Sequence, residues 1–237
     1  MRRYRRSWRR PERYAAPVHI DAATVAPAAV AAVLGWCAGL VSAHTMRRLA
    51  PGGDGAGRHG RVLAPDLLVQ AGVALVWLLI AVVVAGPTWR WLVSGMLAVP
   101  LVQVAVTDLR TRYVYTVVAA AGLAGGLVFG GVVHDAAWWW GPVGALVGLL
   151  IFGLLYGLGR LMYRGGEPLA QGDVTIAAMV GAIAGPYVLT ALFAGTLLSG
   201  LAALGVGLAT RSRQALMPYG PGLCLGGLLS LFMGVSM

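Results

Sequence analysis

The sequence contains no lysine, only two cysteines and only eight acidic residues, and 11% of its 237 residues are charged. A water-soluble domain carries about 25% charged residues, so this deficit excludes an ordinary soluble fold. Hydrophobic residues make up 59% of the chain. The composition therefore predicts an all-α protein embedded in a membrane, because a helix satisfies its own backbone hydrogen bonds in lipid.

The scarcity of cysteine also restricts the chemistry that can be expected. Cys37 and Cys224 both lie in apolar stretches and no Cys-x-x-Cys pair occurs, so no cysteine-based zinc site is predicted. We expect both thiols to act as small buried hydrophobic groups. The four histidines are scattered without the spacing of metal ligands, and none is placed as the base of a serine or cysteine nucleophile. No metal or other cofactor is predicted.

Arginine supplies all eighteen cations and gives a formal net charge of +10. A basic chain can bind nucleic acid. Here the arginines lie in an N-terminal tail and in short loops between apolar runs, and orientation in a bilayer explains that placement better. The expected environment is therefore lipid, and no nucleic-acid partner is predicted.

The apolar runs between these charges set the number of expected spans. A transmembrane helix needs about 20 apolar residues. The longest run has Gly185-Pro186 near its middle, where we expect a turn because proline lacks a backbone donor. Splitting that run predicts about eight spans. The runs cover residues 22–46, 67–89, 91–107, 113–134, 136–159, 174–210 and 214–237.

The arginines alternate between these runs and predict the orientation. Alternate loops hold only Arg90 or no arginine, whereas the others hold two or more. Cytoplasmic loops are enriched in arginine. The loops predicted to be cytoplasmic are 45–65, 108–112, 160–172 and 211–213.

The basic tail over residues 1–23 disagrees with this alternation. It contains seven arginines and would lie outside by parity. Three explanations stay open: the tail is translocated, the first run does not cross, or translation starts further in. The first apolar run is too long for the h-region of a cleaved signal peptide. The remaining residues, 24–237, are predicted to form one membrane-embedded domain.

Small residues recur four apart within the predicted spans. Such pairs allow helices to approach closely in lipid. We expect close helix packing at Gly122/Gly126, Gly144/Gly148, Gly153/Gly157 and Gly181/Gly185.

Two acids stand at junctions between a cytoplasmic loop and a span. Asp108 and Asp173 are separated by two predicted spans, so they lie on the same face of the membrane. Two close carboxylates in a shielded site cannot both ionise and so share a proton, which supplies an acid and a base together. Plainer alternatives stay open: Asp108 balances Arg110 and Arg112 in a solvated loop, and Asp173 caps a helix.

The segments around these acids resemble a known family. "TDLRTRYVYTVVAAAGLAGGL" resembles the first aspartate motif of the type IV prepilin peptidases, and "AQGDVTIAAMVGAIAG" resembles their second, the GxGD motif. "MPYGPGLCLGG" resembles their last span, and "LGWCAGLVSAHTMRRLAP" weakly resembles the first. The resemblance covers roughly residues 30–235 in the right order.

The resemblance implies a multi-pass membrane aspartyl endopeptidase of the bacterial inner membrane. Members remove a short basic leader from prepilins or pseudopilins of type IV pilus and secretion systems at the cytoplasmic face. Asp108 and Asp173 match the two catalytic aspartates, and Gly172 belongs to the turn that supports Asp173. Glu167, in the same cytoplasmic loop, is predicted to help receive the basic leader.

Three positions depart from the family pattern without removing a carboxylate. They are Ala170 in place of the first glycine of GxGD, Thr175 in place of a lysine, and Tyr115 within Val-Tyr-Thr in place of Ile-Pro-Asn. The loop 45–65 also lacks the cysteine pairs of larger members, so zinc is not expected and N-methylation of the pilin stays doubtful. The departures support one alternative, an inactive membrane scaffold of the pilus machinery. Another alternative is a proton-coupled transporter.

Overall fold

The computed structural model describes residues 30–41 apart from residue 32, 63–83, 88–111, 114, 116–162, 169–210 and 219–233. Helices joined by turns make up these residues, and no strand occurs among them, which confirms the all-α prediction. The basic tail 1–23, the loop residues 45–62, and the segments holding Tyr115 and Glu167 lie outside the described residues.

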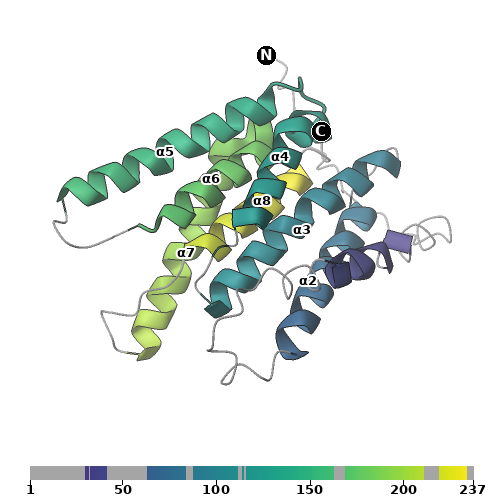
Figure 1. Cartoon of the computed structure of the whole chain (residues 1–237), viewed down its shortest axis with the longest axis horizontal. Coiled ribbons are helices and arrows are strands. Elements are labelled where there is room, and N and C mark those ends of the chain that lie inside the picture. The colour runs from purple at the N-terminus through teal and green to yellow at the C-terminus, as the bar shows by residue number, and fades with distance from the viewer. Residues whose placement is uncertain are drawn as a thin grey trace, which may run out of the picture.

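The helices of the described part follow one another along the chain and are labelled in Figure 1. A helical stretch over residues 33–41 precedes them. Their bounds are α2 Leu63–Val83, α3 Thr88–Thr111, α4 Thr116–Val133, α5 Trp140–Met162, α6 Gln171–Ala184, α7 Val188–Thr210 and α8 Gly220–Met233, with the 3₁₀ turn η2 Gly185–Tyr187 between α6 and α7.

The described helices are apolar enough for a membrane protein. Four helical runs have the length and hydropathy to cross a bilayer, and two shorter apolar helices, 69–83 and 220–233, accompany them. The four runs are Trp89–Leu109, Thr116–Val133, Trp140–Met162 and Gln171–Ala209. The last run contains the predicted Gly185-Pro186 turn, which the structure confirms as η2. Gly185 there has φ +52°, a left-handed conformation that glycine adopts readily.

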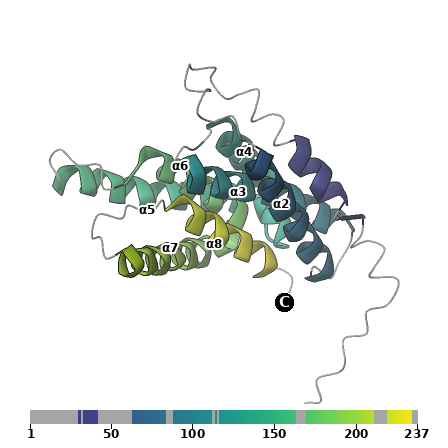
Figure 2. The same ribbon diagram turned by 90° about the horizontal axis from the view of Figure 1, so that it is seen from below.

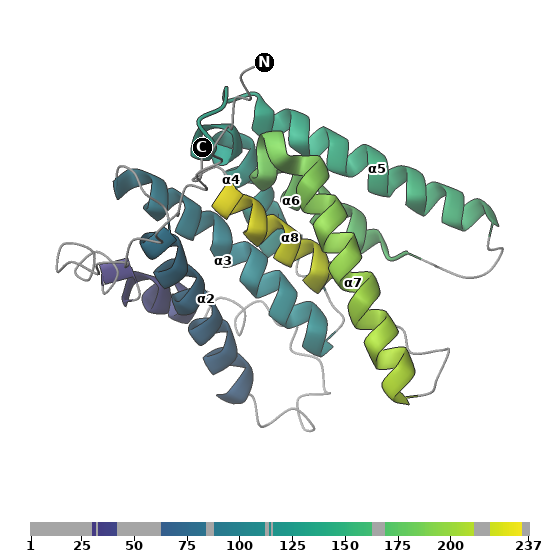
Figure 3. The same ribbon diagram turned by 180° about the vertical axis from the view of Figure 1, so that it is seen from behind.

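The short helix α6 lies at the centre of the bundle. It packs against α4, α5, α7 and α8, and it is buried continuously from Ile176 to Ala184. From η2 the chain turns back, and α7 runs beside α8 (Figure 3). The stretch 33–41 and α2 lie on the side of the bundle away from α5 and α7 (Figure 2).

Glycines make the close approach between α5 and α6 possible. A Cβ at Gly144 would lie 2.9 Å from the carbonyl carbon of Gly181, and one at Gly148 would lie 2.8 Å from that of Ala177. Gly126 of α4 approaches the backbone of Ile183 equally closely. The predicted packing at these glycines is confirmed, and neither helix has room to accommodate a methyl group here.

The prediction for Gly153 and Gly157 is wrong. A Cβ at either position would meet nothing within 4 Å. The two helices are antiparallel and Gly148 faces Ala177, so Gly153 lies about level with the start of α6 and the rest of α5 continues beyond it. Figure 1 shows the C-terminal half of α5 projecting from the bundle.

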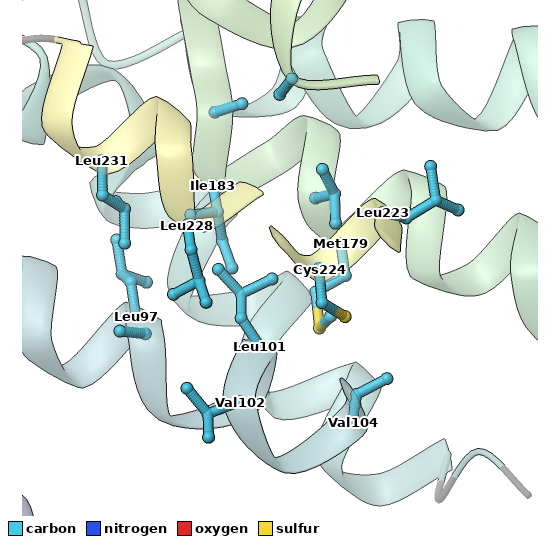
Figure 4. Packing of buried hydrophobic residues seen from close by; sticks show 14 of the residues in the cluster. Leu97, Leu101, Val102, Val104, Met179, Ile183, Leu223, Cys224, Leu228 and Leu231 are labelled. Atoms are coloured by element: carbon cyan, nitrogen blue, oxygen red, sulfur yellow. The ribbon is translucent and has the colours of Figure 1, made fainter. Parts of the chain in front are cut away.

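Buried side chains from α3, α6 and α8 belong to one hydrophobic cluster in the core. Leu101, Ile183 and Leu223 are fully buried there. Figure 4 shows Leu101 next to Ile183 and Leu228, and Met179 next to Cys224, whereas Leu223 points away from Leu101. This cluster holds α8 against α3 and α6, the two helices that carry the acids considered below.

The opposite end of the bundle, named here the Arg90 end, is closed by polar contacts. Arg90 at the start of α3 forms an ion pair with Asp135 in the turn between α4 and α5. His134 is buried, and its Nε2 lies 3.1 Å from the carbonyl oxygen of Ile183. Its Nδ1 has no hydrogen-bond partner among the described residues.

Acidification is expected to destabilise the Arg90 end. Burial lowers the pKa of His134 from its ordinary 6.5, so the folded protein binds fewer protons than the unfolded chain once the pH falls below that value. The stabilising effect of the neutral ring is complete above pH 6.5 and is lost as the pH falls towards the folded-state pKa. We expect the unfolding temperature in detergent to drop between about pH 7.5 and about pH 5.5. His134→Gln should show a clearly smaller drop, and an equal drop would contradict this role.

Candidate active site

Asp108 lies in the last turn of α3, at the end of that helix opposite to Arg90. Eighteen residues of helix separate the two, a distance of about 27 Å. Its side chain is only 5% exposed, whereas the next residue, Leu109, is 55% exposed. Asp108 therefore points into the bundle, and the alternative of a solvated loop acid is wrong.

Asp173 lies in the first turn of α6 and is 8% exposed. Its carboxylate Oδ2 accepts a hydrogen bond of 3.3 Å from the backbone N–H of Ala170, and its own N–H donates to the carbonyl of Ala170 at 3.0 Å. Ala170 is thus the N-cap and Asp173 the third helical residue, so the prediction of Asp173 as N-cap is corrected. The carboxylate still satisfies a backbone donor at the helix start.

The residues around Asp173 differ in part from expectation. Gly172 is the second residue of α6 and packs against Val114, so it lies within the helix and not in a preceding turn. Ala170 has φ −78° and ψ 147°, an extended conformation open to any residue. Alanine in place of the family's glycine therefore introduces no backbone strain here.

Helix α8 brings the two acids together. Its first residue, Gly220, is buried against both partner helices: a Cβ there would lie 3.1 Å from Cγ of Asp108 and 2.8 Å from Cδ1 of Ile176, and closer still to Oδ2 of Asp108. Ile176 follows Asp173 by one turn of α6. Gly220 therefore stands between Asp108 and the first turns of α6, and both carboxylates lie at the same end of the bundle. This end of the bundle is named here the Asp108 end.

The two acids are recessed below the ends of the longer helices. The 14 residues of α6 and of α8 span about 21 Å each, less than the roughly 30 Å of a hydrocarbon core. Helices α5 and α7, with 23 residues each, continue past the starts of α6 and α8 on either side (Figure 3). The acids, which adjoin the starts of α6 and α8, are therefore set back from the ends of α5 and α7.

The helix dipoles do not distinguish the two carboxylates. Asp173 lies at a helix start and Asp108 near the end of its own helix. However, the start of α8 also lies against Asp108, and a helix start favours an anion. The helix dipoles therefore do not indicate which carboxylate is the acid and which is the base.

Sequence reasoning missed three residues of this arrangement, namely Ser199, Gly220 and Cys224. The Ser199 hydroxyl is 3.0 Å from the carbonyl of Tyr219, the residue before Gly220. The Cys224 thiol lies against the backbone of Ala105, one turn before Asp108. The Gly-Pro pair at 220–221 signals a helix start, but nothing in the sequence indicates which helix it faces.

The other candidate positions contribute less. Thr175 lies in the first turns of α6, where its hydroxyl is 3.5 Å from the carbonyl of its own helix residue Gln171. Glu167 and Tyr115 lie outside the described residues, so their predicted roles stay predictions. Among the described residues, no group of three histidines, cysteines or acids is placed to hold a metal ion.

The arrangement is suited to acid–base chemistry on a bound molecule. Two shielded carboxylates that lie close together can hold one proton between them. One can then accept a proton while the other donates one. Their burial keeps both carboxylates away from bulk water.

Comparison with known families identifies one match. The model of the type IV leader peptidase family matches residues 95–208, a segment that contains both Asp108 and Asp173 and ends before α8. Neither the curated proteins nor the solved structures gave a significant match.

Proposed function

Because residues 95–208 belong to the type IV leader peptidase family, we propose that the chain is an aspartyl endopeptidase. Its substrate would be a prepilin or pseudopilin, from which it removes a short basic leader at the cytoplasmic face of the inner membrane. The observation that carries this proposal is the pair of buried carboxylates, Asp108 and Asp173, beside the start of α8.

The two acids would hydrolyse the peptide bond together. One carboxylate, ionised, takes a proton from a water molecule while the water oxygen attacks the scissile carbonyl carbon. The other, protonated, donates a hydrogen bond and then its proton to the carbonyl oxygen. The carboxylate that took the water's proton then gives it to the leaving amine nitrogen, while the other takes a proton from a hydroxyl of the tetrahedral intermediate. The C–N bond breaks, and the pair again holds one proton. No covalent intermediate with the protein and no metal is needed.

The substrate would present a basic leader on the cytoplasmic side and an apolar segment in the bilayer. Asp108, Asp173 and Glu167, which precedes α6 in the sequence, would supply negative charge at that end. We retain Glu167 as the predicted acceptor of the leader, and the lipid bilayer as the second partner.

Co-expression tests this function directly. We expect the wild-type chain to shorten a prepilin encoded near its own gene, visible as a shift in size, and the new N-terminus to follow the leader. A folded wild-type chain that leaves its genomic prepilins intact would favour the inactive scaffold. Proton-coupled transport by the same acids would instead appear as solute uptake into proteoliposomes.

The proposal also includes eight spans with the Asp108 end facing the cytoplasm. We expect single cysteines at positions 54, 166 and 212 to react with an impermeant reagent only from the cytoplasmic side. A cysteine at position 135, beside the Arg90 end, should react only from outside. The background is Cys37→Ser with Cys224→Ala. Labelling of position 135 only from the inside would contradict the orientation.

A further inference from the structure

We propose that Ser199 and Gly220 are positioning residues for Asp108. In this proposal the Ser199 hydroxyl holds the start of α8 in place, and the bare Cα of Gly220 allows that start to lie against the Asp108 carboxylate. The kinetic part of this proposal rests on the proposed function. Its structural part, the placement of α8 against α3, does not.

Gly220 provides the direct contact. The residue is buried, and a side chain there would collide with Oδ2 of Asp108 on α3 and with Ile176 on α6. Both obstacles are held in the core, because Ile176 is 0% exposed and Asp108 is nearly so. A methyl group at residue 220 must therefore move either the carboxylate or the start of α8.

Ser199 fixes the start of α8 from the other side. Its hydroxyl lies 3.0 Å from the carbonyl of Tyr219 and 3.0 Å from the carbonyl of Gly195 in its own helix. The Tyr219 carbonyl also accepts the first backbone bond of α8, from the N–H of Leu223 at 3.2 Å. Ser199 thus ties α7 to the first turn of α8.

Glycines on α8 make this tie possible. A Cβ at Gly222 would collide with Ser199, and one at Gly226 would lie 2.8 Å from the backbone nitrogen of Gly195. Helix α8 therefore lies against α7 along one side, and its Gly220 side faces Asp108. Contacts of α8 with α7 are in this way transmitted to the position of a carboxylate on α3.

The first test compares identical substitutions at a crowded and an open glycine. Gly220→Ala is expected to lower kcat for leader removal by about 100-fold, since a shift of about 1 Å in a catalytic group has an effect of this size. KM should change little, because the substitution moves a reacting group. Gly153→Ala, where a Cβ meets nothing, should leave both constants unchanged. Equal constants for the two variants would overturn the proposal.

The second test concerns the hydroxyl. Ser199→Ala is expected to lower kcat about five- to tenfold, the effect of one lost hydrogen bond. The matched control is Ser230→Ala, a buried serine whose hydroxyl is 2.6 Å from Gly227 of its own helix. In the Gly220→Ala background, Ser199→Ala should add little. Equal losses of kcat in the two serine variants would show only a general packing effect. That result, or fully additive effects of Ser199→Ala and Gly220→Ala, would contradict the positioning of Asp108 by Ser199.

A third measurement does not depend on activity. The Cys224 thiol on α8 lies against the backbone of Ala105 on α3, so Ala105→Cys in a Cys37→Ser background should form an oxidant-induced disulfide between α3 and α8. We expect Ser199→Ala and Gly220→Ala to reduce the yield of this cross-link, and Ser230→Ala to leave it unchanged. Failure to cross-link in the parent would contradict the placement of α8. Altered cross-linking without any cleavage by the wild type would reject the proposed function alone.

Discussion

Asp108→Asn and Asp173→Asn are each expected to abolish leader removal, with the protein still inserted and folded. Asparagine keeps the shape of the side chain but can neither accept the proton of the attacking water nor donate as an acid. Acid–base groups contribute about 100- to 10,000-fold to a rate, so we expect cleavage to fall below detection in an overnight co-expression. The double variant should be scarcely worse than either single variant, because the two groups act as one unit.

The control for this pair is Asp135→Asn at the Arg90 end. Asp135 has φ +54°, a conformation that asparagine tolerates well, and its partner is Arg90 and not a catalytic group. This variant should retain most of its cleavage. Processing at a near wild-type rate by either Asp108→Asn or Asp173→Asn would refute the aspartyl mechanism.

Gly144→Ala is expected to destabilise the protein and to reduce cleavage. The added methyl group would meet the carbonyl carbon of Gly181 at 2.9 Å and the carbonyl oxygen of Gly185 at 3.2 Å. Backbone atoms cannot move aside as a flexible side chain can, so α5 and α6 must separate. Overpacking of this kind costs about 1–3 kcal/mol. Because α6 carries Asp173, the separation also displaces one of the two acids.

The matched substitution is Gly157→Ala, on the same helix. A Cβ at Gly157 meets nothing within 4 Å, and alanine favours a helix over glycine. We therefore expect unchanged or slightly raised stability in detergent and unchanged cleavage. Thermal unfolding of the two variants side by side decides the point. Similar destabilisation of both would mean that the α5–α6 contact does not depend on its glycines.

Much of the fold follows from charge and glycine patterns in the sequence. Charged interruptions separate the apolar runs, and Gly185-Pro186 divides the longest of them, because proline removes a donor and glycine reaches a positive φ. The pairing of Arg90 with Asp135 agrees with the predicted parity, which places both on one side of the membrane. The pattern of charges thus predicts where the apolar runs are separated and in which direction each helix runs.

The relative depth of the helices could not be predicted in the same way. A glycine spacing of four indicates a surface suited to close packing but not whether a partner reaches that far. Gly144 and Gly148 meet α6. Gly153 is about level with the start of α6 and Gly157 lies beyond it, and neither has a neighbour among the described residues.

The site shows the same limit. The motifs around Asp108 and Asp173 indicate the acids, but the contact of Gly220 with Asp108 depends on how α8 sits between α3 and α6. That placement depends on glycines of α7 and α8 together with the side chains that they meet on α3 and α6. The spacing of residues along one helix does not reveal the placement of α8.

Under the proposed function, the unequal lengths of the helices set a minimum length for the substrate segment that extends from the lipid headgroups to the acids. Gly148 is level with Ala177, so Arg160 in the last turn of α5 stands about two turns, or ~11 Å, beyond Asp173. Lipid headgroups level with the ends of α5 and α7 must either move towards the shorter α6 and α8 or leave the space beside the acids to water. Either arrangement is a local thinning of the bilayer. An extended chain covers about 3.3 Å per residue. Some three to four unfolded residues are therefore needed between the scissile bond and the first charge that stays at headgroup level.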